Sequence, residues 1–431
     1  MSTTDDRIRV AVAGIGGRGT WAAQQLAQHP AYRLTALCDV NLGKLDHFRR
    51  KAALEHVPAA PSIEACLRDF ELDAVVVTVH DAAHANVAIP ALEAGKFVFV
   101  EKPLEATAAR CRAIVEADRA AGGKTFVGMN LRFAPLYATA KRLVDQGAVG
   151  QVLTIQADEF YDGGRSYFRR WNRLRAFGGG LWITKACHDF DLLYWLAGQM
   201  PRAVYAIDAL TCYRPRADAP LYCADCERKE TCFDSFYHGR REPEEKSLAE
   251  VAAEHGDPRP DLCLFNADKD TFDHGIATVD FEGGILGTYT CNVVAGFTDR
   301  RLRVSGTRGT LDGSLASETV LLRQRDPRSS EEVSLDTAAG GHGGGDSLLF
   351  EEFADFVRGT REPRVRPPEA MVAVLMGLAA TRSADERRRV EMSELEATHT
   401  RRRRPCPSPP SRRSSTPSET SRKPRKTSRR R

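Results

Sequence analysis

The segment from residue 9 to residue 19 restricts the fold of this chain most strongly. It reads R-V-A-V-A-G-I-G-G-R-G, and it places a strand, a tight turn and a helix start within eleven residues. The apolar run at 10–13 is typical of a parallel strand that is buried on both faces. Gly14, Gly16 and Gly19 follow at the spacing G-x-G-x-x-G. The first glycine allows a sharp turn, the second lets backbone amides approach a pyrophosphate, and the third lets a helix lie close to the strand.

This turn predicts a dinucleotide site with its phosphate charge at a helix N-terminus. Asp39 supports the prediction, because it follows Gly19 by twenty residues at the end of a second apolar run, 34–38. A carboxylate there accepts hydrogen bonds from ribose hydroxyls and repels a ribose phosphate, so it favours NAD over NADP. The alternative is that Asp39 only caps the next helix. The cofactor, NAD with NADP as the other candidate, is assigned to Gly14, Ile15, Gly16, Gly17, Arg18, Gly19 and Asp39.

Strand-like and helix-like segments alternate through residues 1–128. Helices are expected at 20–29, 44–55, 87–94 and 105–121, and further strands at 74–79, 97–100 and 125–128. Such alternation predicts an α/β fold with a doubly wound parallel sheet, whose ligands bind at the carboxyl ends of the strands. Further cofactor candidates near these ends are Thr78, His80, Glu101 and Lys102.

Lys102 follows one of these strands and precedes the fixed turn at Pro103. An ammonium at a strand end can hydrogen-bond a substrate hydroxyl and stabilise the alkoxide that develops on it. The alternative is a solvated surface lysine. The strand end and the proline favour the functional interpretation.

The length of 431 residues is enough for about two domains with sizeable cores. The formal net charge of +4 is unevenly spread, since thirteen Lys or Arg and one Glu lie beyond residue 398. We expect 397–431 to form a disordered basic tail, and the acidic remainder argues against a nucleic-acid-binding fold except through that tail. No stretch resembles a membrane span or a secretory signal, so we expect a cytoplasmic protein whose eleven cysteines are mostly reduced.

A glycine-rich entry at 178–180 leads into a helix-like stretch with polar groups at intervals of three. Lys185, His188 and Asp191 would share one face of a single helix. A neutral histidine there can take the proton from a hydroxyl, and a carboxylate can fix its orientation. These three are catalytic candidates, with His188 as the base. The other interpretation is a histidine satisfied by local hydrogen bonds.

The loop 167–173, Y-F-R-R-W-N-R, precedes this stretch. Aromatic faces pack on sugar C–H surfaces, and guanidinium groups bind hydroxyls or carboxylates. Arg170 and Trp171 are therefore substrate candidates together with His188. An ordinary basic surface loop explains the pattern equally well.

Four cysteines gather in an insertion-like stretch at about 212–260. They are Cys212, Cys223, Cys226 and Cys232. Such a set could hold a tetrahedral structural Zn²⁺, and reduced thiols or a redox pair are the alternative. No His or carboxylate motif completes an open site, so no catalytic metal is expected.

Residues 274–335 alternate between polar and apolar types with glycine turns, which predicts an antiparallel sheet. Asp346 is expected to cap a helix at 348–357, and Pro367 to begin a last helix that reaches about 384. Residues 129–396 are therefore expected to form a second domain.

Four segments together resemble the glucose-fructose oxidoreductase, inositol dehydrogenase and rhizopine-catabolism family, Gfo/Idh/MocA. They are G-I-G-G-R-G at 14–19, C-D at 38–39, E-A-G-K-F-V-F-V-E-K-P at 93–103 and G-M-N-L-R-F-A-P at 128–135. The resemblance implies a Rossmann domain followed by an α+β domain with an open, largely antiparallel sheet. It also implies NAD(P)-dependent oxidation or reduction of sugars and cyclic polyols, with Lys102 as a catalytic residue. Asn130 and Arg132 become cofactor candidates by family position alone, and a homodimer or homotetramer through the outer face of the second sheet is expected.

The chain departs from this family pattern at one place. An aspartate usually stands four residues before the histidine, where this chain has Thr184. Threonine cannot act as a carboxylate base, so the role of that aspartate is either lost or moved to Lys185, Asp189 or the substrate pocket. Two other functions remain open: an NAD-dependent enzyme that cleaves glycosides by transient oxidation, and a regulator that binds NAD without turnover.

Overall fold

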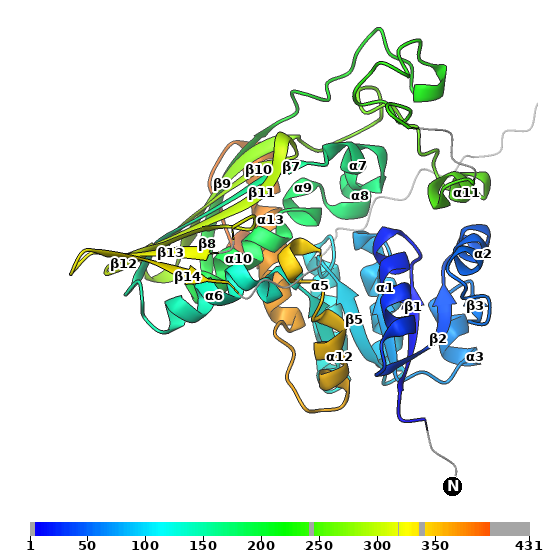
Figure 1. Ribbon diagram of the computed structural model, residues 1–431, viewed down its shortest axis with the longest axis horizontal. Helices are drawn as coiled ribbons and strands as arrows, with labels where there is room; N and C mark the ends of the chain where they lie inside the picture. The colour runs from blue at the N-terminus through cyan, green and yellow to red at the C-terminus, as the bar shows by residue number, and fades with distance from the viewer. Residues whose placement is uncertain (1–4, 241–244, 318, 336–340, 397–431) are drawn as a thin grey trace, which may run out of the picture.

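The computed structural model describes residues 5–240, 245–317, 319–335 and 341–396. They contain a six-stranded sheet and a nine-stranded sheet, which lie in different halves of the molecule (Figure 1). The predicted tail at 397–431 lies outside the described residues, and the domain boundaries at 128 and 396 stay predictions. Within the described ranges, no helix is both long and apolar enough to cross a membrane.

The first sheet has the strand order β3-β2-β1-β4-β5-β6, and all of its pairs are parallel. Its strands are β1 (Ile8–Ala13), β2 (Tyr32–Cys38), β3 (Ala59–Ala60), β4 (Ala74–Val77), β5 (Phe97–Glu101) and β6 (Thr125–Gly128). The helices between them are α1 (Gly17–Gln28), α2 (Leu42–Lys51), α3 (Ile63–Asp69), α4 (His84–Glu93) and α5 (Ala108–Ala120). The strand order reverses between β1 and β4, and ligands of such sheets bind beyond the strand ends at this position. The predicted doubly wound sheet is confirmed.

The helices of this half differ in whether a side chain caps their N-terminus. The side chains of Asn41, Ser62 and Thr107 cap α2, α3 and α5 by accepting a backbone N–H of the first turn. By contrast, α1 begins at Gly17, three residues before the predicted start, and has no side-chain cap. Its first N–H groups therefore remain open toward an anionic ligand.

The second sheet has the order β14-β13-β12-β11-β7-β10-β9-β8-β15. Its pairs are antiparallel, except that β7 and β10 are parallel. The strands are β7 (Val152–Asp162), β8 (Pro201–Ala209), β9 (His274–Phe281), β10 (Leu286–Asn292), β11 (Val294–Gly306), β12 (Gly309–Ser314), β13 (Thr319–Gln324), β14 (Ser329–Ser334) and β15 (Val390–Glu391). This confirms the predicted open, largely antiparallel sheet.

Helices lie on one face of the second sheet and between the two halves (Figure 1). The helices that follow β6 are α6 (Pro135–Asp145), α7 (Gly164–Arg169), α8 (Arg175–Gly178), α9 (Leu181–Thr184), α10 (Cys187–Ala197), α11 (Leu248–Glu254), α12 (Leu349–Val357), α13 (Pro367–Glu386) and α14 (Ser393–Glu396). Of these, α11 lies beside α2 of the first half (Figure 1). Although α12 follows strand β14 of the second sheet in sequence, its Phe350 and Phe353 pack with Tyr32 and Phe99 in the core of the first half. The two halves therefore share a packed boundary.

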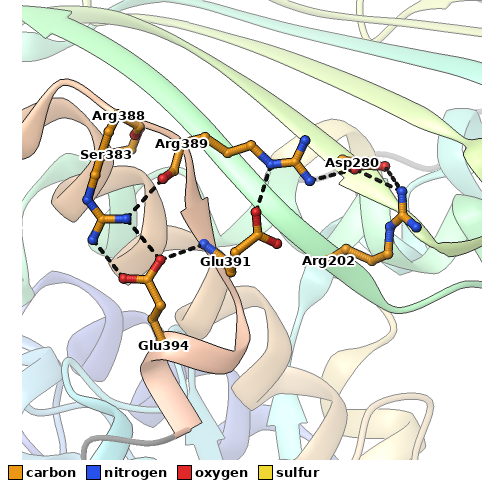
Figure 2. Close-up of polar contacts among 7 residues, drawn as sticks. All are labelled: Arg202, Asp280, Ser383, Arg388, Arg389, Glu391 and Glu394. Carbon is orange, nitrogen blue, oxygen red and sulfur yellow. Dashed lines mark hydrogen bonds and ion pairs between the residues drawn. The ribbon is translucent and has the colours of Figure 1, made fainter.

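The short strand β15 forms one edge of the second sheet, and charged side chains form ion pairs around it (Figure 2). Arg389 and Arg202 both donate to Asp280, at 2.8 Å and 3.0 Å, and Arg388 donates to Glu394 at 2.7 Å. Exposed ion pairs of this kind contribute only about 0–1 kcal/mol each. Their charge nevertheless discourages another strand from adding to this edge.

Candidate active site

The glycine turn after β1 has the close contacts that its spacing predicts. Gly14 has a φ of +96°, and a Cβ at Gly19 would lie only 1.7 Å from the Gly14 carbonyl oxygen. A Cβ at Gly16 would meet nothing within 4 Å. The turn is therefore packed on the strand side and open at Gly16, where backbone amides can meet a pyrophosphate, so these residues fit a dinucleotide.

Asp39 lies directly across this turn at the end of β2. Its carboxylate accepts hydrogen bonds from the backbone N–H groups of Ile15, at 2.7 Å, and Asn41, at 2.9 Å. The Lys44 ammonium lies 2.9 Å from the same carboxylate. Asp39 is thus held rigidly where a carboxylate can meet the adenosine ribose. Lys44 was not among the predicted residues, although its position on the first turn of α2 could have indicated it.

The insertion reaches back from the second sheet to cover this end of the first half (Figure 1). Its helix α11 packs on α2, where Asn41 Nδ2 donates to the Ala252 carbonyl at 3.1 Å and to Asp257 at 3.0 Å. A Cβ at Gly43 would collide with the His255 ring. The capping box of Ser247 and Glu250 starts this helix and was readable in the sequence, but its packing partner was not.

Three predicted cofactor residues are joined in one polar cluster beside the turn. Arg18 donates to Glu101 at 2.6 Å and to Asp346 at 3.1 Å, and Asn130 Nδ2 donates to Asp346 at 2.8 Å. Asp346 therefore does not cap the helix that follows it, because α12 begins at Leu349 without a side-chain cap. The predicted capping role is wrong: the long-range partners outcompete the helix end for this carboxylate. The cofactor roles of Arg18, Glu101 and Asn130 stay predictions.

Lys102 joins the two halves at the end of β5. Its Nζ donates to the Thr184 carbonyl oxygen at 3.4 Å, at the end of α9 and four residues before His188. The next residue, Pro103, is held by a residue that the sequence analysis missed: His84 Nδ1 lies 2.9 Å from its carbonyl oxygen. Burial lowers the pKa of His84 to about 4, so a neutral ring can donate an N–H there.

The predicted single helix through 185, 188 and 191 is wrong. It is broken, because α9 ends at Thr184 and α10 begins at Cys187, and Lys185 lies in the break. Lys185 Nζ pairs with Glu159 of β7 at 2.7 Å, and the same buried carboxylate pairs with Arg300 of β11. Lys185 is therefore held by a buried ion-pair network, away from the predicted shared face.

His188 and Asp191 do lie one turn apart on α10, and both are buried. Both Asp191 oxygens accept from Arg132, at 2.7 and 2.8 Å. This bidentate pair fixes Arg132, a predicted cofactor residue, and occupies the carboxylate that was expected to orient His188. The long-range partner was not visible in the local spacing.

The segment 167–173, expected to be a loop, is largely helical, because 167–169 end α7 and 171–173 form a short helix. It borders both the glycine turn and the junction of the two halves. A Cβ at Gly17 would lie 3.9 Å from Arg170 Nη1, so this guanidinium lies beside the start of α1. The Trp171 ring lies 6.0 Å from that of His80, a half-buried residue whose pKa burial lowers. Thr78 Oγ1 donates to the Gly14 carbonyl at 2.7 Å and so braces the glycine turn. Arg170, predicted for the substrate, thus lies closer to the cofactor turn than expected.

The four cysteines considered as zinc ligands are not all brought together. In the described part of the chain, no three His, Cys, Asp or Glu side chains are placed to hold one metal ion. Cys223, Cys226 and Cys232 border one small pocket with Cys263, whereas Cys212 is exposed and does not line it. The ten described cysteines carry free thiols, which agrees with the alternative of reduced thiols.

Comparison with known families identifies both halves. Residues 8–129 match the description "Oxidoreductase family, NAD-binding Rossmann fold", and residues 141–392 match "Oxidoreductase family, C-terminal alpha/beta domain", both of the GFO_IDH_MocA type. The chain is 30% identical to YteT of Bacillus subtilis, described only as an oxidoreductase, over 84% of this chain and 92% of that protein. It is 24% identical to the myo-inositol 2-dehydrogenase of Thermotoga maritima, over 90% of this chain and 99% of that enzyme.

Solved structures share this fold at low sequence identity. A levoglucosan dehydrogenase in complex with NADH and levoglucosan has a TM-score of 0.68 at 18% identity and covers 90% of this chain and 99% of that one. An oxidoreductase domain protein from Kribbella flavida has a TM-score of 0.69 at 18% identity, with the same two coverages. With both of its halves matched by family descriptions, the chain belongs to the Gfo/Idh/MocA oxidoreductase family, and its first half is an NAD-binding Rossmann domain.

Proposed function

We propose that this protein is an NAD-dependent dehydrogenase or reductase that acts on a hydroxyl or carbonyl group of a sugar, a sugar derivative or a cyclic polyol. The observation that carries the proposal is the position of Lys102, an ammonium at the end of β5 that touches the segment leading to His188. The names of the relatives support the substrate class, because they include myo-inositol and scyllo-inositol 2-dehydrogenases.

In this proposal, the glycine turn, Asp39 and Arg170 bind the cofactor, which supplies the hydride acceptor. His188 takes the proton of the reacting hydroxyl, and Lys102 stabilises the charge that develops on its oxygen. Lys185 and Asp191 stabilise the structure around the site through their ion pairs with Glu159 and Arg132, respectively. Trp171 offers an aromatic face to the sugar C–H surface.

A screen of the purified chain with NAD and NADP against inositols, sugars and glycosides, followed by absorbance of the reduced cofactor, tests this function. Net reduction of NAD with one of these alcohols supports it. Glycoside cleavage without net consumption of NAD would instead identify the eliminating enzyme. NAD binding without turnover of any alcohol would contradict enzyme function.

Replacing Asp39 with asparagine tests the choice of cofactor. The variant is expected to lower kcat/KM for NAD by about 10- to 100-fold, because a hydrogen bond to a charged group contributes about 1.5–3 kcal/mol. The value for NADP should rise, since Lys44 remains beside the site while the repelling charge is gone. Asp46→Asn, on the exposed side of α2, is the matched control and should change neither value. An unchanged NAD preference in Asp39→Asn would contradict this role.

We also propose that the protein forms a homodimer or homotetramer through the outer face of the second sheet. Tyr205, Ile207, Ile276 and Leu286 are exposed there, on the side opposite the buried Ala206 and Ala277. Ile207 and Ile276 lie directly opposite each other on β8 and β9. Exposed apolar clusters of this kind mark association surfaces. The free thiols agree with a reducing compartment such as the cytoplasm, where we place the enzyme.

Ile207→Glu is expected to dissociate this assembly, because a carboxylate at its centre would lose hydration without a partner. Light scattering after size exclusion should then give the mass of one chain for the variant and a multiple of it for the original protein. Leu221→Glu, at an exposed apolar position of the insertion, is the control and should leave the mass unchanged. A single-chain mass for the original protein would refute the proposal.

A further inference from the structure

A buried carboxyl group of the first half, that of Asp81, lies beside Thr184 of the second half. Thr184 is the position at which the family resemblance implies a carboxylate four residues before His188, and the chain has a hydroxyl there instead. Asp81, which begins the short helix Asp81–Ala83 after β4, lies beside the Thr184 side chain. A methyl group built at Gly178 would lie 3.3 Å from both Asp81 Oδ2 and Thr184 Cβ. The carboxyl of Asp81 and the side chain of Thr184 therefore border the same small space.

This carboxyl is deeply buried and incompletely bonded. Asp81 is 5% exposed, and its Oδ2 has no hydrogen-bond partner among the described atoms. Lys102 is the largest charge that acts on it, and Lys102 Nζ in turn donates to the carbonyl oxygen of Thr184. The Asp81 carboxyl and the Lys102 ammonium thus lie beside the same residue, one near the Thr184 side chain and the other at its carbonyl oxygen, and they come from the ends of β4 and β5.

The other acidic groups near Lys102 are either uncharged near neutral pH or paired with another cation. Burial raises the pKa of the Cys187 thiol to about 12 and that of the Tyr167 phenol above its usual range, so both are uncharged near neutral pH. Glu101 is paired with Arg18. Burial raises the pKa of Asp81 to about 7, so this group becomes an anion within the range in which an enzyme works.

We propose that Asp81 is a positioning residue that replaces the missing carboxylate at 184 and holds Lys102 in its ammonium form beside the reacting oxygen. Burial lowers the pKa of Lys102, whereas the neighbouring Cys187, Tyr167, Asp81 and Glu101 side chains raise it, in that order. Of these four, Asp81 is the one that above pH 7 is neither neutral nor paired with another cation. The charged or titratable groups that face the pair from the packed elements are Glu101, Glu105, His84, Arg175, Tyr167 and Cys187. Of these, Arg175 is paired with Asp385 and Glu105 with Arg110.

The inference rests on the proposed function for the role of Lys102, but its first test needs no substrate. The rate of acetylation of Lys102 by acetic anhydride, followed by mass spectrometry of the full chain after digestion, reports the fraction of free amine at each pH, with Lys96 as an internal reference. Asp81→Asn should lower the pKa of Lys102 by about 1 to 3 units. Its acetylation at pH 8 should therefore rise about 10- to 1000-fold relative to Lys96.

The second test uses turnover. In Asp81→Asn, the alkaline limb of the pH profile of kcat should move to lower pH, while KM for NAD stays unchanged. Adding Thr184→Asp to this variant returns the carboxylate to the usual family position, and it should restore both the labelling rate and the limb. Asp69→Asn, an exposed carboxylate of α3, is the matched control. Asp81→Ser offers a smaller uncharged side chain if asparagine disturbs folding.

Unchanged labelling of Lys102 in both uncharged variants would overturn the inference. If acetylation of Lys102 changes in the Asp81 variants but the original protein oxidises no sugar or polyol, Asp81 still controls the charge of Lys102. The proposed function is then refuted instead. Loss of turnover without any change in labelling or in the pH profile would assign Asp81 a purely structural role and would also overturn the inference.

Discussion

Lys102→Met is expected to lower kcat by about 10²- to 10⁴-fold, the range that one positioned acid or electrostatic group contributes. Methionine keeps the length and apolar stem of lysine, so the junction with Thr184 should remain packed. The affinity for NAD, measured by calorimetry, should change only a few-fold, because the glycine turn and Asp39 do not depend on this ammonium. The loss should therefore appear in kcat and in the burst of reduced cofactor, both followed by absorbance.

Lys96→Met provides the matched control, since it removes an ammonium from the start of the same strand segment without touching the junction. Its kcat and its NAD affinity should equal those of the original chain. A Lys102→Met variant that kept more than a tenth of the activity would show that the reacting oxygen lies elsewhere.

Gly19→Ala is expected to disable the first half altogether. The added methyl carbon would lie 1.7 Å from the Gly14 carbonyl oxygen and 2.8 Å from Thr78 Oγ1. The clashing oxygen belongs to the backbone of the turn, so relief requires α1 to move away from the sheet. Overpacking of a core costs about 1–3 kcal/mol or more, and we expect the upper end or beyond. Urea unfolding should show the lost stability, and calorimetry should show no binding of NAD at concentrations that saturate the original chain.

Gly16→Ala is the comparison that separates packing from binding. Its methyl group would meet no protein atom within 4 Å, so the unfolding curve should stay within about 1 kcal/mol of the original. NAD affinity should still fall at least about tenfold, because the methyl group occupies the approach of the pyrophosphate. Equal destabilisation by the two alanines would contradict the difference in packing described above.

The sequence by itself determined the parallel sheet, the glycine turn and the class of cofactor. These depend on short-range regularities: a buried strand of four apolar residues, three glycines at fixed spacing, and an acid twenty residues later. Strand periodicity likewise predicted the second sheet. The family resemblance added the oxidoreductase class, which the family matches confirm.

Only the tertiary structure decided the polar partners in and around the site. Asp191 and Arg132, Lys185 and Glu159, and Asp81 and Thr184 are pairs whose members are far apart in the sequence. Spacing of three residues suggested a shared helix face for 185, 188 and 191, but the break between α9 and α10 and the stronger long-range ion pairs determined the arrangement. The physical reason is that a buried charge must find its partner wherever the fold brings one, and local periodicity carries no information about that partner.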